Sequence, residues 1–199
     1  MPSTVEFWFE FASSYSYVAA ARLEALAEER GCRVRWRPFL LGPIFSQQGW
    51  ADSPFNLYPA KGRYMWRDME RTCERLALSF QRPSVFPRSG LLAARVACGA
   101  QEESWLPVFV RRVFQANFAR DEDISSEEVL GACLAGLVDR PDVCLAASRT
   151  PEAKERLRAQ TAQAQALGIF GAPTLRVGEE LFWGSDRLQE ALDWASAAP

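Results

Sequence analysis

A strand, a turn carrying two serines and a helix open this chain, and that succession limits it to folds built on a βαβ unit. Residues 4–11 alternate in polarity and then run apolar and aromatic, which predicts a strand with buried neighbours. Ser13 and Ser14 follow, where either can cap a helix predicted from about Ser14 to Glu29. A second strand is predicted over residues 33–39. A right-handed crossover is expected for such a unit, so the chain is predicted to be α/β.

The middle of the chain is predicted to be helical, and its end returns to strands. Residues 42–59 are rich in glycine, proline, serine and aromatic residues, which predicts an irregular loop bordering a site. Helices are expected over residues 62–78, 89–99, 103–119, 126–139 and 150–167. A hairpin is expected over 174–177 and 180–182, followed by a helix over 185–195. We therefore predict one α/β domain from residues 1–41 and 169–199, with the loop and an all-helical insertion at 42–168.

Charge and hydropathy exclude several classes of partner. The 199 residues carry 23 Lys and Arg against 25 Asp and Glu, a net charge of −2, so no basic surface predicts binding to nucleic acid or to an anionic membrane. No apolar stretch approaches the roughly 20 residues that span a bilayer, and no basic segment leads into an apolar run at the amino terminus. We expect a soluble cytoplasmic protein.

The absence of histidine restricts the chemistry further. No residue of the chain is histidine, which excludes Ser-His-Asp triads, Cys-His dyads and histidine-ligated metals, and we expect no metal site. The five cysteines stand singly, without the two-residue spacing of a redox or zinc motif. The turn between the first strand and helix has serine and no cysteine. A thiol used there would have to be supplied by a bound molecule.

Ser13 is the leading candidate for chemistry. A hydroxyl at a helix amino terminus can donate to an anion that the helix dipole also favours, and thiolates benefit from this arrangement. The alternative is that Ser13 only caps the helix. Pro173 begins a strand that resembles the proline-led strand facing such a turn in thioredoxin-like proteins. A cis Ala172–Pro173 bond would direct backbone groups toward the site; the alternative is an ordinary trans proline.

A second candidate precedes the last helix. Gly184, Ser185 and Asp186 stand where a hydroxyl and helix amides can bind a carboxylate while Asp186 faces an ammonium group, which fits an amino-acid head group. The alternative is a plain helix cap with an acidic first turn. Trp50 and Trp183 are the two tryptophans we expect at a pocket, because each lies beside a candidate loop.

Four segments together resemble the 2-hydroxychromene-2-carboxylate isomerase family: residues 9–17, 53–68, 114–124 and 168–188. The most specific is Gly-Ile-Phe-Gly-Ala-Pro-Thr at 168–174, followed by Phe-Trp-Gly-Ser-Asp-Arg-Leu at 182–188. The family is related to kappa-class glutathione transferases and to DsbA. The resemblance implies a thioredoxin-like fold with a helical insertion, a homodimer, and glutathione as cofactor.

The resemblance also implies roles for individual residues. Ser13 would hydrogen-bond the sulfur of glutathione and lower its pKa, and Ala172 beside cis Pro173 would pair with the glutathione backbone. Ser185 and Asp186 would hold its γ-glutamyl end. The remaining expected contacts are Trp183 and Gly184 to glutathione, and Tyr15, Trp50, Asn56 and Lys61 to a small aromatic substrate.

Departures from the family pattern keep other functions open. The usual Ser-Pro-Tyr is Ser13-Ser14-Tyr15 here, and a frequent asparagine is replaced around Ser89. The leading prediction is a glutathione-dependent isomerase of an aromatic or chromene-type carboxylate. A kappa-like glutathione transferase and a noncatalytic thiol-binding protein are the alternatives, whereas thiol-disulfide exchange is disfavoured because the turn lacks a cysteine.

Overall fold

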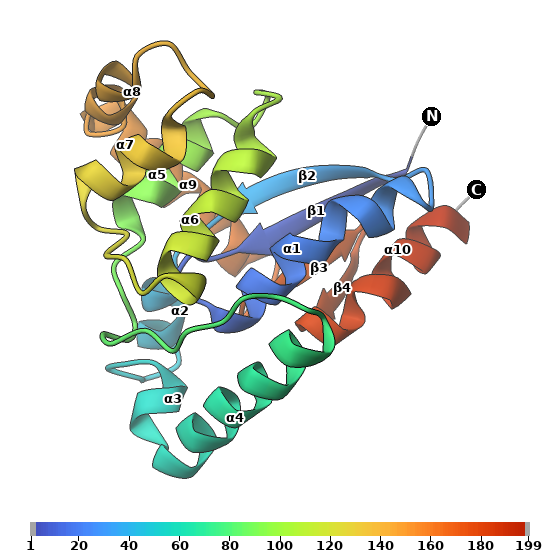
Figure 1. The fold of residues 1–199 in the computed structure, drawn as a ribbon. Helices are drawn as coiled ribbons and strands as arrows, with labels where there is room; N and C mark the ends of the chain where they lie inside the picture. Colours follow the sequence, from blue (N-terminus) through green and yellow to red (C-terminus); the bar gives the residue numbers. More distant parts are fainter. Residues whose placement is uncertain (1–2, 198–199) are drawn as a thin grey trace.

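A four-stranded mixed sheet and a block of helices build the fold seen in the computed structural model, which describes residues 3–197 (Figure 1). The strands are β1 (Thr4–Phe9), β2 (Arg33–Pro38), β3 (Thr174–Val177) and β4 (Glu180–Trp183), in the order β2-β1-β3-β4. β1 pairs parallel with β2 and antiparallel with β3, and β3 pairs antiparallel with β4. The βαβ opening and the closing hairpin therefore meet in one sheet.

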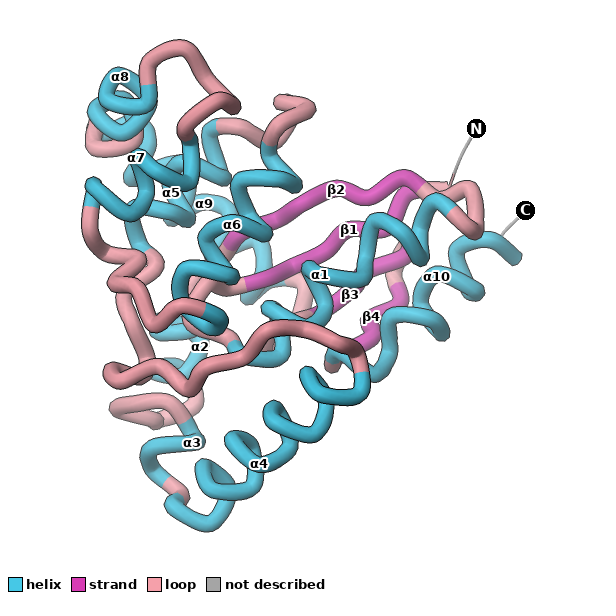
Figure 2. Tube along the Cα trace, in the orientation of Figure 1, coloured by secondary structure: helices cyan, strands magenta, loops and turns pink. Residues whose placement is uncertain are grey.

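Besides the strands, the described chain forms ten α-helices and one 3-10 helix, joined by loops (Figure 2). They are α1 (Ser14–Glu28), α2 (Leu41–Gln47), α3 (Pro54–Leu57), α4 (Pro59–Arg75), α5 (Leu91–Gly99), α6 (Leu106–Ala119), α7 (Glu127–Leu134), α8 (Pro141–Ala147), α9 (Pro151–Ala166), η1 (Ser185–Arg187) and α10 (Leu188–Ala197). The helices α2 to α9 all lie between β2 and β3 along the chain. The division of the chain at residues 42 and 168 stays a prediction.

The alternating side chains of β1 place it between two cores. Val5, Phe7 and Phe9 join the larger cluster of buried residues, while Trp8 points into a smaller one with Phe39. A strand buried on both faces reads as a continuous apolar run, which is the pattern of residues 7–9. β1 is one of the two inner strands, and its side chains are packed on both faces of the sheet.

Helices cover both faces of the sheet. α1 and α10 pack together and against β1, β2 and β3 on the face seen toward the viewer in Figure 1, and α5 and α9 contact β2. α4 lies beside α1 and contacts it. This arrangement leaves the amino terminus of α1 between α2, α4 and the β3–β4 hairpin (Figure 1).

The prediction of an irregular loop over residues 42–59 is wrong in part, because α2 and α3 form in this segment. Pro43 lies in the first turn of α2, where its missing N–H has no helical partner to lose. Ser53 caps α3 by accepting from the Phe55 N–H at 3.3 Å, and Pro54 is the first helical residue. The prolines and serine that suggested a loop are helix-initiating residues here.

The single helix predicted over residues 126–139 is also wrong. α7 ends at Leu134, and Gly136 has a φ of +73°, a conformation that glycine adopts without strain. α8 then begins at Pro141, where no element was predicted. The apolar periodicity of the sequence continues beyond Gly136, so it did not indicate that the helix ends before this glycine.

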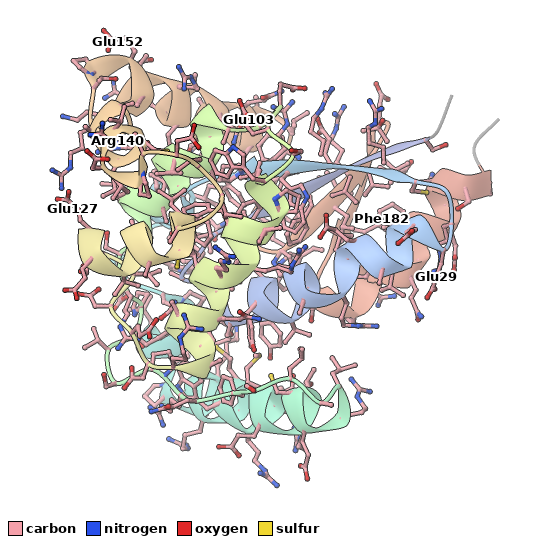
Figure 3. All side chains as sticks on the ribbon, turned by 45° about the horizontal axis from the view of Figure 1, so that its top comes forward. Glu29, Glu103, Glu127, Arg140, Glu152 and Phe182 are labelled. Atoms are coloured by element: carbon pink, nitrogen blue, oxygen red, sulfur yellow. The ribbon has the colours of Figure 1, made fainter. Side chains whose placement is uncertain are left out.

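Charged side chains cover the outside of the helical block. Glu127, Arg140 and Glu152 all lie on its exposed surface (Figure 3). Within residues 3–197, no helix is long and apolar enough to cross a membrane. Across the same residues, no three His, Cys, Asp or Glu side chains gather in a way that could hold a metal ion.

Candidate active site at the Ser13 turn

Ser13 caps α1 and joins it to the other end of the chain. Its backbone is extended, with φ −84° and ψ 114°, and its Oγ accepts a hydrogen bond from the Ser16 N–H at 3.1 Å. The same hydroxyl donates to the carbonyl oxygen of Ala172 at 3.0 Å. Ser13 is therefore a helix cap that also contacts Ala172, the residue before the strand-leading proline, and its proposed role toward an anion stays a prediction.

The Ala172–Pro173 peptide bond is cis. β3 begins only at Thr174, whose hydroxyl donates to the Gly171 carbonyl at 2.8 Å. Because Ala172 lies outside the paired part of the sheet, its backbone is not engaged in the β1–β3 ladder. This segment presents main-chain atoms beside Ser13.

Gly184 connects the candidate head-group residues to Pro173. Its N–H donates to the Pro173 carbonyl at 3.0 Å. Its φ of +122° is a conformation open to glycine, and a β-carbon would lie 2.4 Å from Asp186 Oδ1. The side chain of Asp186 is 78% exposed, with Arg187 Nε at 3.8 Å. The sharp turn at Gly184 thus brings Ser185 and Asp186 beside the cis-proline segment.

Trp183 lies over the same segment. A β-carbon on Gly171 would be 2.5 Å from Trp183 Nε1, so only glycine allows this approach. The Trp183 ring contacts Phe170, with ring centroids 5.0 Å apart, and both side chains are exposed. Two exposed aromatic rings therefore stand beside the cis proline, an arrangement that favours ligand contact.

Tyr15 extends the site toward α4. Its hydroxyl donates to Asp68 Oδ2 at 3.1 Å, and Arg71 Nη2 lies 3.4 Å from Asp68 Oδ1. Burial raises the pKa of Tyr15, and the negative charge of Asp68 raises it further. The phenol therefore stays protonated. The sequence analysis did not predict the contact between Tyr15 and Asp68.

The other three residues expected at a substrate pocket contact residues other than Ser13. Trp50 stacks near Phe45, with centroids 5.6 Å apart. Asn56 Nδ2 donates to Asp52 Oδ2 at 3.0 Å and to the Phe86 carbonyl at 3.3 Å. Lys61 Nζ lies 5.8 Å from the centre of the ring of Tyr58. Their roles at a substrate stay predictions.

Glu10 is a site residue that the sequence analysis missed. It follows the last residue of β1, just before the turn, and its Oε2 accepts from the Leu41 N–H at 2.6 Å. Burial raises the pKa of Glu10 to about 7, while the Leu41 hydrogen bond lowers it only in part. A glutamate after an apolar strand was the available signal, but its burial depends on α2.

The thiols of this chain lie elsewhere. Burial raises the pKa of Cys73 and of Cys133 to about 11, so both thiols stay protonated. Cys32 lies beyond the far end of α1, with Sγ 3.8 Å from the Leu192 carbonyl. The Ser13 turn therefore has no protein thiol beside it in sequence, and its hydroxyl faces a backbone carbonyl.

A serine-capped helix opposite a cis proline is the geometry of a thioredoxin-type site. The model of the DSBA-like thioredoxin domain matches residues 4–193. The chain belongs to this family. The DSBA-like domain includes the sheet, the Ser13 turn and the inserted helices, so the fold predicted from the sequence is confirmed.

Curated relatives and a solved structure agree with this DSBA-like assignment. A 2-hydroxychromene-2-carboxylate isomerase of Sphingobium xenophagum is 28% identical over 189 residues, covering 94% of this chain and 95% of the relative. A glutathione S-transferase kappa 2 of Caenorhabditis elegans is 23% identical, covering 96% and 90%. The structure of a 2-hydroxychromene-2-carboxylate isomerase has a TM-score of 0.84 at 25% identity, covering 96% of this chain and 93% of that one. The predicted resemblance is confirmed, and these relatives are enzymes.

Proposed function

We propose that this protein is a glutathione-dependent isomerase of an aromatic or chromene-type carboxylate. The observation that carries the proposal is the Ser13 hydroxyl at the cap of α1, 3.0 Å from the Ala172 carbonyl, in a turn without cysteine. A thioredoxin-type site that lacks its own thiol has to take one from a ligand. The names of the relatives, an isomerase and a glutathione transferase, support a glutathione-related enzyme of one of these two kinds.

The residues beside Ser13 fit glutathione. The exposed carboxylate of Asp186 suits the ammonium group of a γ-glutamyl end, and the Ser185 hydroxyl suits its carboxylate. The backbone of Ala172, outside the β1–β3 ladder, suits the cysteinyl amide of a peptide-like ligand. Gly184 shapes the turn beneath this end of the ligand, and Trp183 covers its side.

Ser13 is proposed to stabilise sulfur as a thiolate. When bound, glutathione would supply a thiolate that adds to the unsaturated substrate and is later eliminated. Ser13 Oγ has one proton to donate, which now goes to the Ala172 carbonyl, so the hydroxyl has to rotate toward the sulfur. The Ser16 N–H keeps Oγ in place during that rotation, and the amino terminus of α1 favours the negative charge.

Other parts of the proposal concern the substrate and assembly. Tyr15, Trp50, Asn56 and Lys61 are proposed to contact a small aromatic substrate, with Tyr15 acting as a protonated phenol. A homodimer in the cytoplasm, with a role in aromatic catabolism, completes the proposal. Light scattering after size exclusion measures the assembly directly.

Calorimetric titration with reduced glutathione tests the cofactor before any substrate is chosen. Wild-type protein is expected to bind, and Asp186→Ala is expected to weaken binding by about tenfold or more, because a charge-assisted hydrogen bond is lost. Ser13→Ala is expected to bind glutathione but to lower turnover by about tenfold to a hundredfold. Thiolate absorbance of the complex measures the pKa that Ser13 is proposed to lower.

Glu179→Ala provides the matched control for Asp186→Ala, because Glu179 is an exposed acid in the β3–β4 turn. It is expected to leave glutathione binding unchanged. Absence of binding at millimolar glutathione contradicts the cofactor assignment, and unchanged kinetics in both site variants contradict the site.

A kappa-like glutathione transferase is the second candidate, and the similarity to the kappa relative favours it. The same thiolate would then leave with the product. Chromatography separates the two, since an isomerase returns all glutathione unchanged and a transferase yields a conjugate. Glutathione binding without turnover across a substrate panel would indicate a noncatalytic binding protein.

A further inference from the structure

A cavity of about 560 Å³ lies between α2, α5 and α9, away from the residues assigned to glutathione. We call it the α5–α9 groove. Its apolar lining is aliphatic and includes Leu40, Pro43, Leu91, Pro151 and Leu157. The volume is in the range of small-molecule sites.

The walls of the groove are tied to one another. Thr161 Oγ1 accepts from the Leu40 N–H at 3.2 Å, which joins α9 to the end of β2. Gln165 Nε2 donates to Gln47 Oε1 at 3.2 Å and to the Pro43 carbonyl at 3.5 Å, which joins α9 to α2. The groove is therefore preformed, and a ligand would not have to order it.

Arg95 of α5 lines the groove and has an unsatisfied buried donor. Its Nε is buried without a hydrogen-bond partner, the one buried nitrogen in that condition among the side chains of residues 3–197. Arg95 forms no ion pair within the same residues. The Nε is covered by protein, so the donors that a ligand in the groove can reach are the terminal Nη groups, which have no hydrogen-bond partner within residues 3–197.

The charges around Arg95 are unbalanced. Lys154, Glu155 and Arg158 also line the groove, and Arg158 Nη1 lies 3.6 Å from Glu155 Oε2. Glu155, the single carboxylate in the lining, is therefore already paired with Arg158. Arg95 and Lys154 remain as cations without an acid partner within residues 3–197, which favours an anion.

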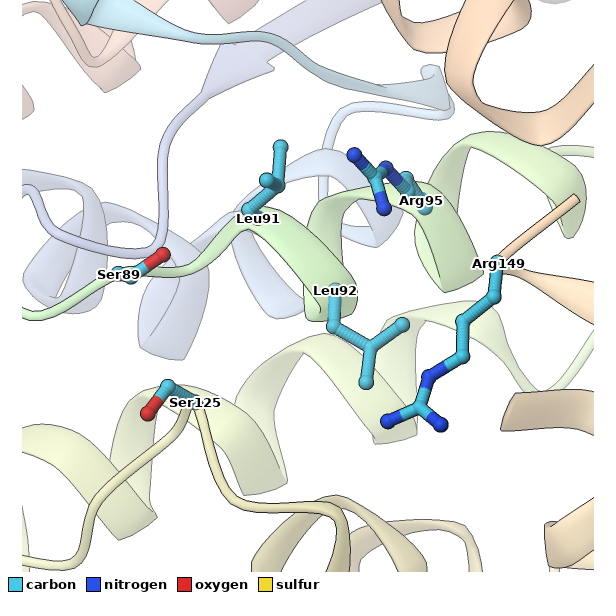
Figure 4. A pocket seen from close by; sticks show the side chains of 6 residues that line it. All are labelled: Ser89, Leu91, Leu92, Arg95, Ser125 and Arg149. Carbon is cyan, nitrogen blue, oxygen red and sulfur yellow. The ribbon is translucent and has the colours of Figure 1, made fainter. Parts of the chain in front are cut away.

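A second, smaller cavity of about 240 Å³ lies against the same arginine (Figure 4). Ser89 and Leu92 line it from the α5 side, and Ser125 and Arg149 line it from the helices that follow. Arg149 is paired with Glu127, so its charge is already balanced. Arg95 separates the two cavities and is the cation that both share.

We propose that the α5–α9 groove binds a small organic anion, a monocarboxylate with an aliphatic body. The carboxylate pairs with the terminal Nη donors of the Arg95 guanidinium, while the body lies along Leu91, Leu157 and Pro43. Planar, paired donors make arginine suited to a carboxylate. The proposal is independent of the glutathione site, since no lining residue belongs to the Ser13 turn or to residues 171–187.

Titration of the ¹⁵N-labelled protein with sodium octanoate, followed by NMR, tests the proposal. The Arg95 Nε–H resonance is expected to shift saturably at millimolar octanoate, together with amides of α5 and α9. Arg95→Met is expected to weaken binding by about tenfold to a hundredfold, the effect of losing a charge-assisted hydrogen bond. Octanamide, which has the same chain without the charge, is expected to bind wild type and Arg95→Met equally weakly.

Three further variants separate a specific site from general effects. Arg95→Lys keeps the charge but loses the planar donors, so intermediate affinity is expected, and it keeps the test valid if Arg95→Met does not fold. Arg67→Met removes an exposed arginine of α4 that pairs with Glu70, and it is expected to bind octanoate as wild type does. Ser13→Ala is expected to bind octanoate unchanged, with or without saturating glutathione.

Three results would overturn the proposal. One is the absence of saturable shifts at millimolar octanoate. Another is equal octanoate affinity in wild type, Arg95→Met and Arg95→Lys. The third is competition by glutathione or loss of binding in Ser13→Ala, which would place octanoate at the Ser13 turn. If the protein proved not to be an isomerase, the octanoate titrations of wild type and of the Arg95 variants would still test this proposal.

Discussion

Glu10 and Ser13 are only three residues apart, but the surrounding protein gives the Ser13 hydroxyl hydrogen-bond partners and disfavours the ionised carboxylate of Glu10. Ser13 has two hydrogen-bond partners and keeps a neutral hydroxyl ready to donate. Glu10 is enclosed by protein with one backbone N–H at its carboxylate, and burial raises its pKa to about 7. A carboxyl group that is half protonated near neutrality is a sensitive reporter of how closely α2 packs on the turn.

Glu10→Gln is expected to remove a pH dependence of stability. In the unfolded chain Glu10 ionises near 4.5, so between pH 4.5 and 7 the folded chain holds a proton that the unfolded chain has lost. The free energy of unfolding therefore falls as pH rises through this window, by on the order of 1–3 kcal/mol. Glutamine keeps an acceptor for the Leu41 N–H. Urea denaturation from pH 4.5 to 8 measures the difference between wild type and variant.

The control for this measurement is Glu179→Gln, which changes an exposed acid in the hairpin turn. Its difference from wild type is expected to stay flat with pH. Parallel curves for wild type and Glu10→Gln across the window would show that Glu10 ionises normally in the folded protein.

Among the elements, α1 combines a well-made cap with two buried hydroxyls that have no partner. Ser14 and Ser16 are both buried, and their Oγ atoms lack hydrogen bonds among the described residues. An unsatisfied buried polar group is unfavourable to the folded state. Ser14 is the first helical residue, a position at which proline is well accepted.

Ser14→Pro is expected to raise the free energy of unfolding by about 0.5–2 kcal/mol, because it removes an unsatisfied hydroxyl and restricts the unfolded chain. The extended backbone of Ser13 suits a residue that precedes proline. Thermal and urea denaturation measure the change, and glutathione binding is expected to be retained.

Ser16→Pro is the comparison within the same turn. It removes the N–H that Ser13 Oγ accepts, so it is expected to lower stability and glutathione affinity. A Ser14→Pro variant as unstable as Ser16→Pro would show that the first turn of α1 does not tolerate the ring.

The helical elements also show where local patterns were insufficient. Proline and glycine are frequent in residues 42–59 and 136–141, but the prolines at 43, 54 and 141 lie in the first turns of helices. Whether Pro43 begins a helix or interrupts a loop depends on what packs against Ile44, which is buried with Trp8. The strands were predicted well because their apolar runs are buried by the sheet itself.

In the whole molecule, Asn117 fastens the helical block to the turn that carries Ser13. Its buried Nδ2 donates to the Phe11 carbonyl at 3.0 Å, and its Oδ1 accepts from Arg88 Nη1 at 3.3 Å. Arg88 is itself buried and pairs with Asp121. Gly90 packs so closely that a β-carbon there would lie 2.7 Å from Phe11 Cβ. Two distant segments, around Gly90 and around Asn117, thus hold one short turn.

Asn117→Leu is expected to lower the free energy of unfolding by about 2–3 kcal/mol, because the buried Phe11 carbonyl and Arg88 each lose a partner. Glutathione affinity is expected to fall as the Ser13 turn loosens. Urea denaturation and calorimetry measure the two effects.

Gln115→Leu serves as the control, since Gln115 is an exposed residue of the same helix. It is expected to change neither quantity by more than about 0.5 kcal/mol. An Asn117→Leu variant that loses stability but binds glutathione as wild type does would limit Asn117 to a structural role.

The resemblance to thioredoxin-like proteins supplied the expectation that the Pro173 strand faces the Ser13 turn. Local pattern determined the opening βαβ unit, the closing hairpin, Ser13 as a candidate cap and Pro173 as the start of a strand. These follow from the two-residue period of strands, the capping preference of serine and the fixed φ of proline, all of which act over a few residues. The tertiary structure alone decided that Ser13 donates to a carbonyl 159 residues away and that Tyr15 donates to Asp68. It also decided that Glu10 is enclosed and that Arg95 has a buried donor without a partner. Burial, hydrogen-bond partners and pKa depend on which distant segments pack against a residue, and no local pattern specifies them.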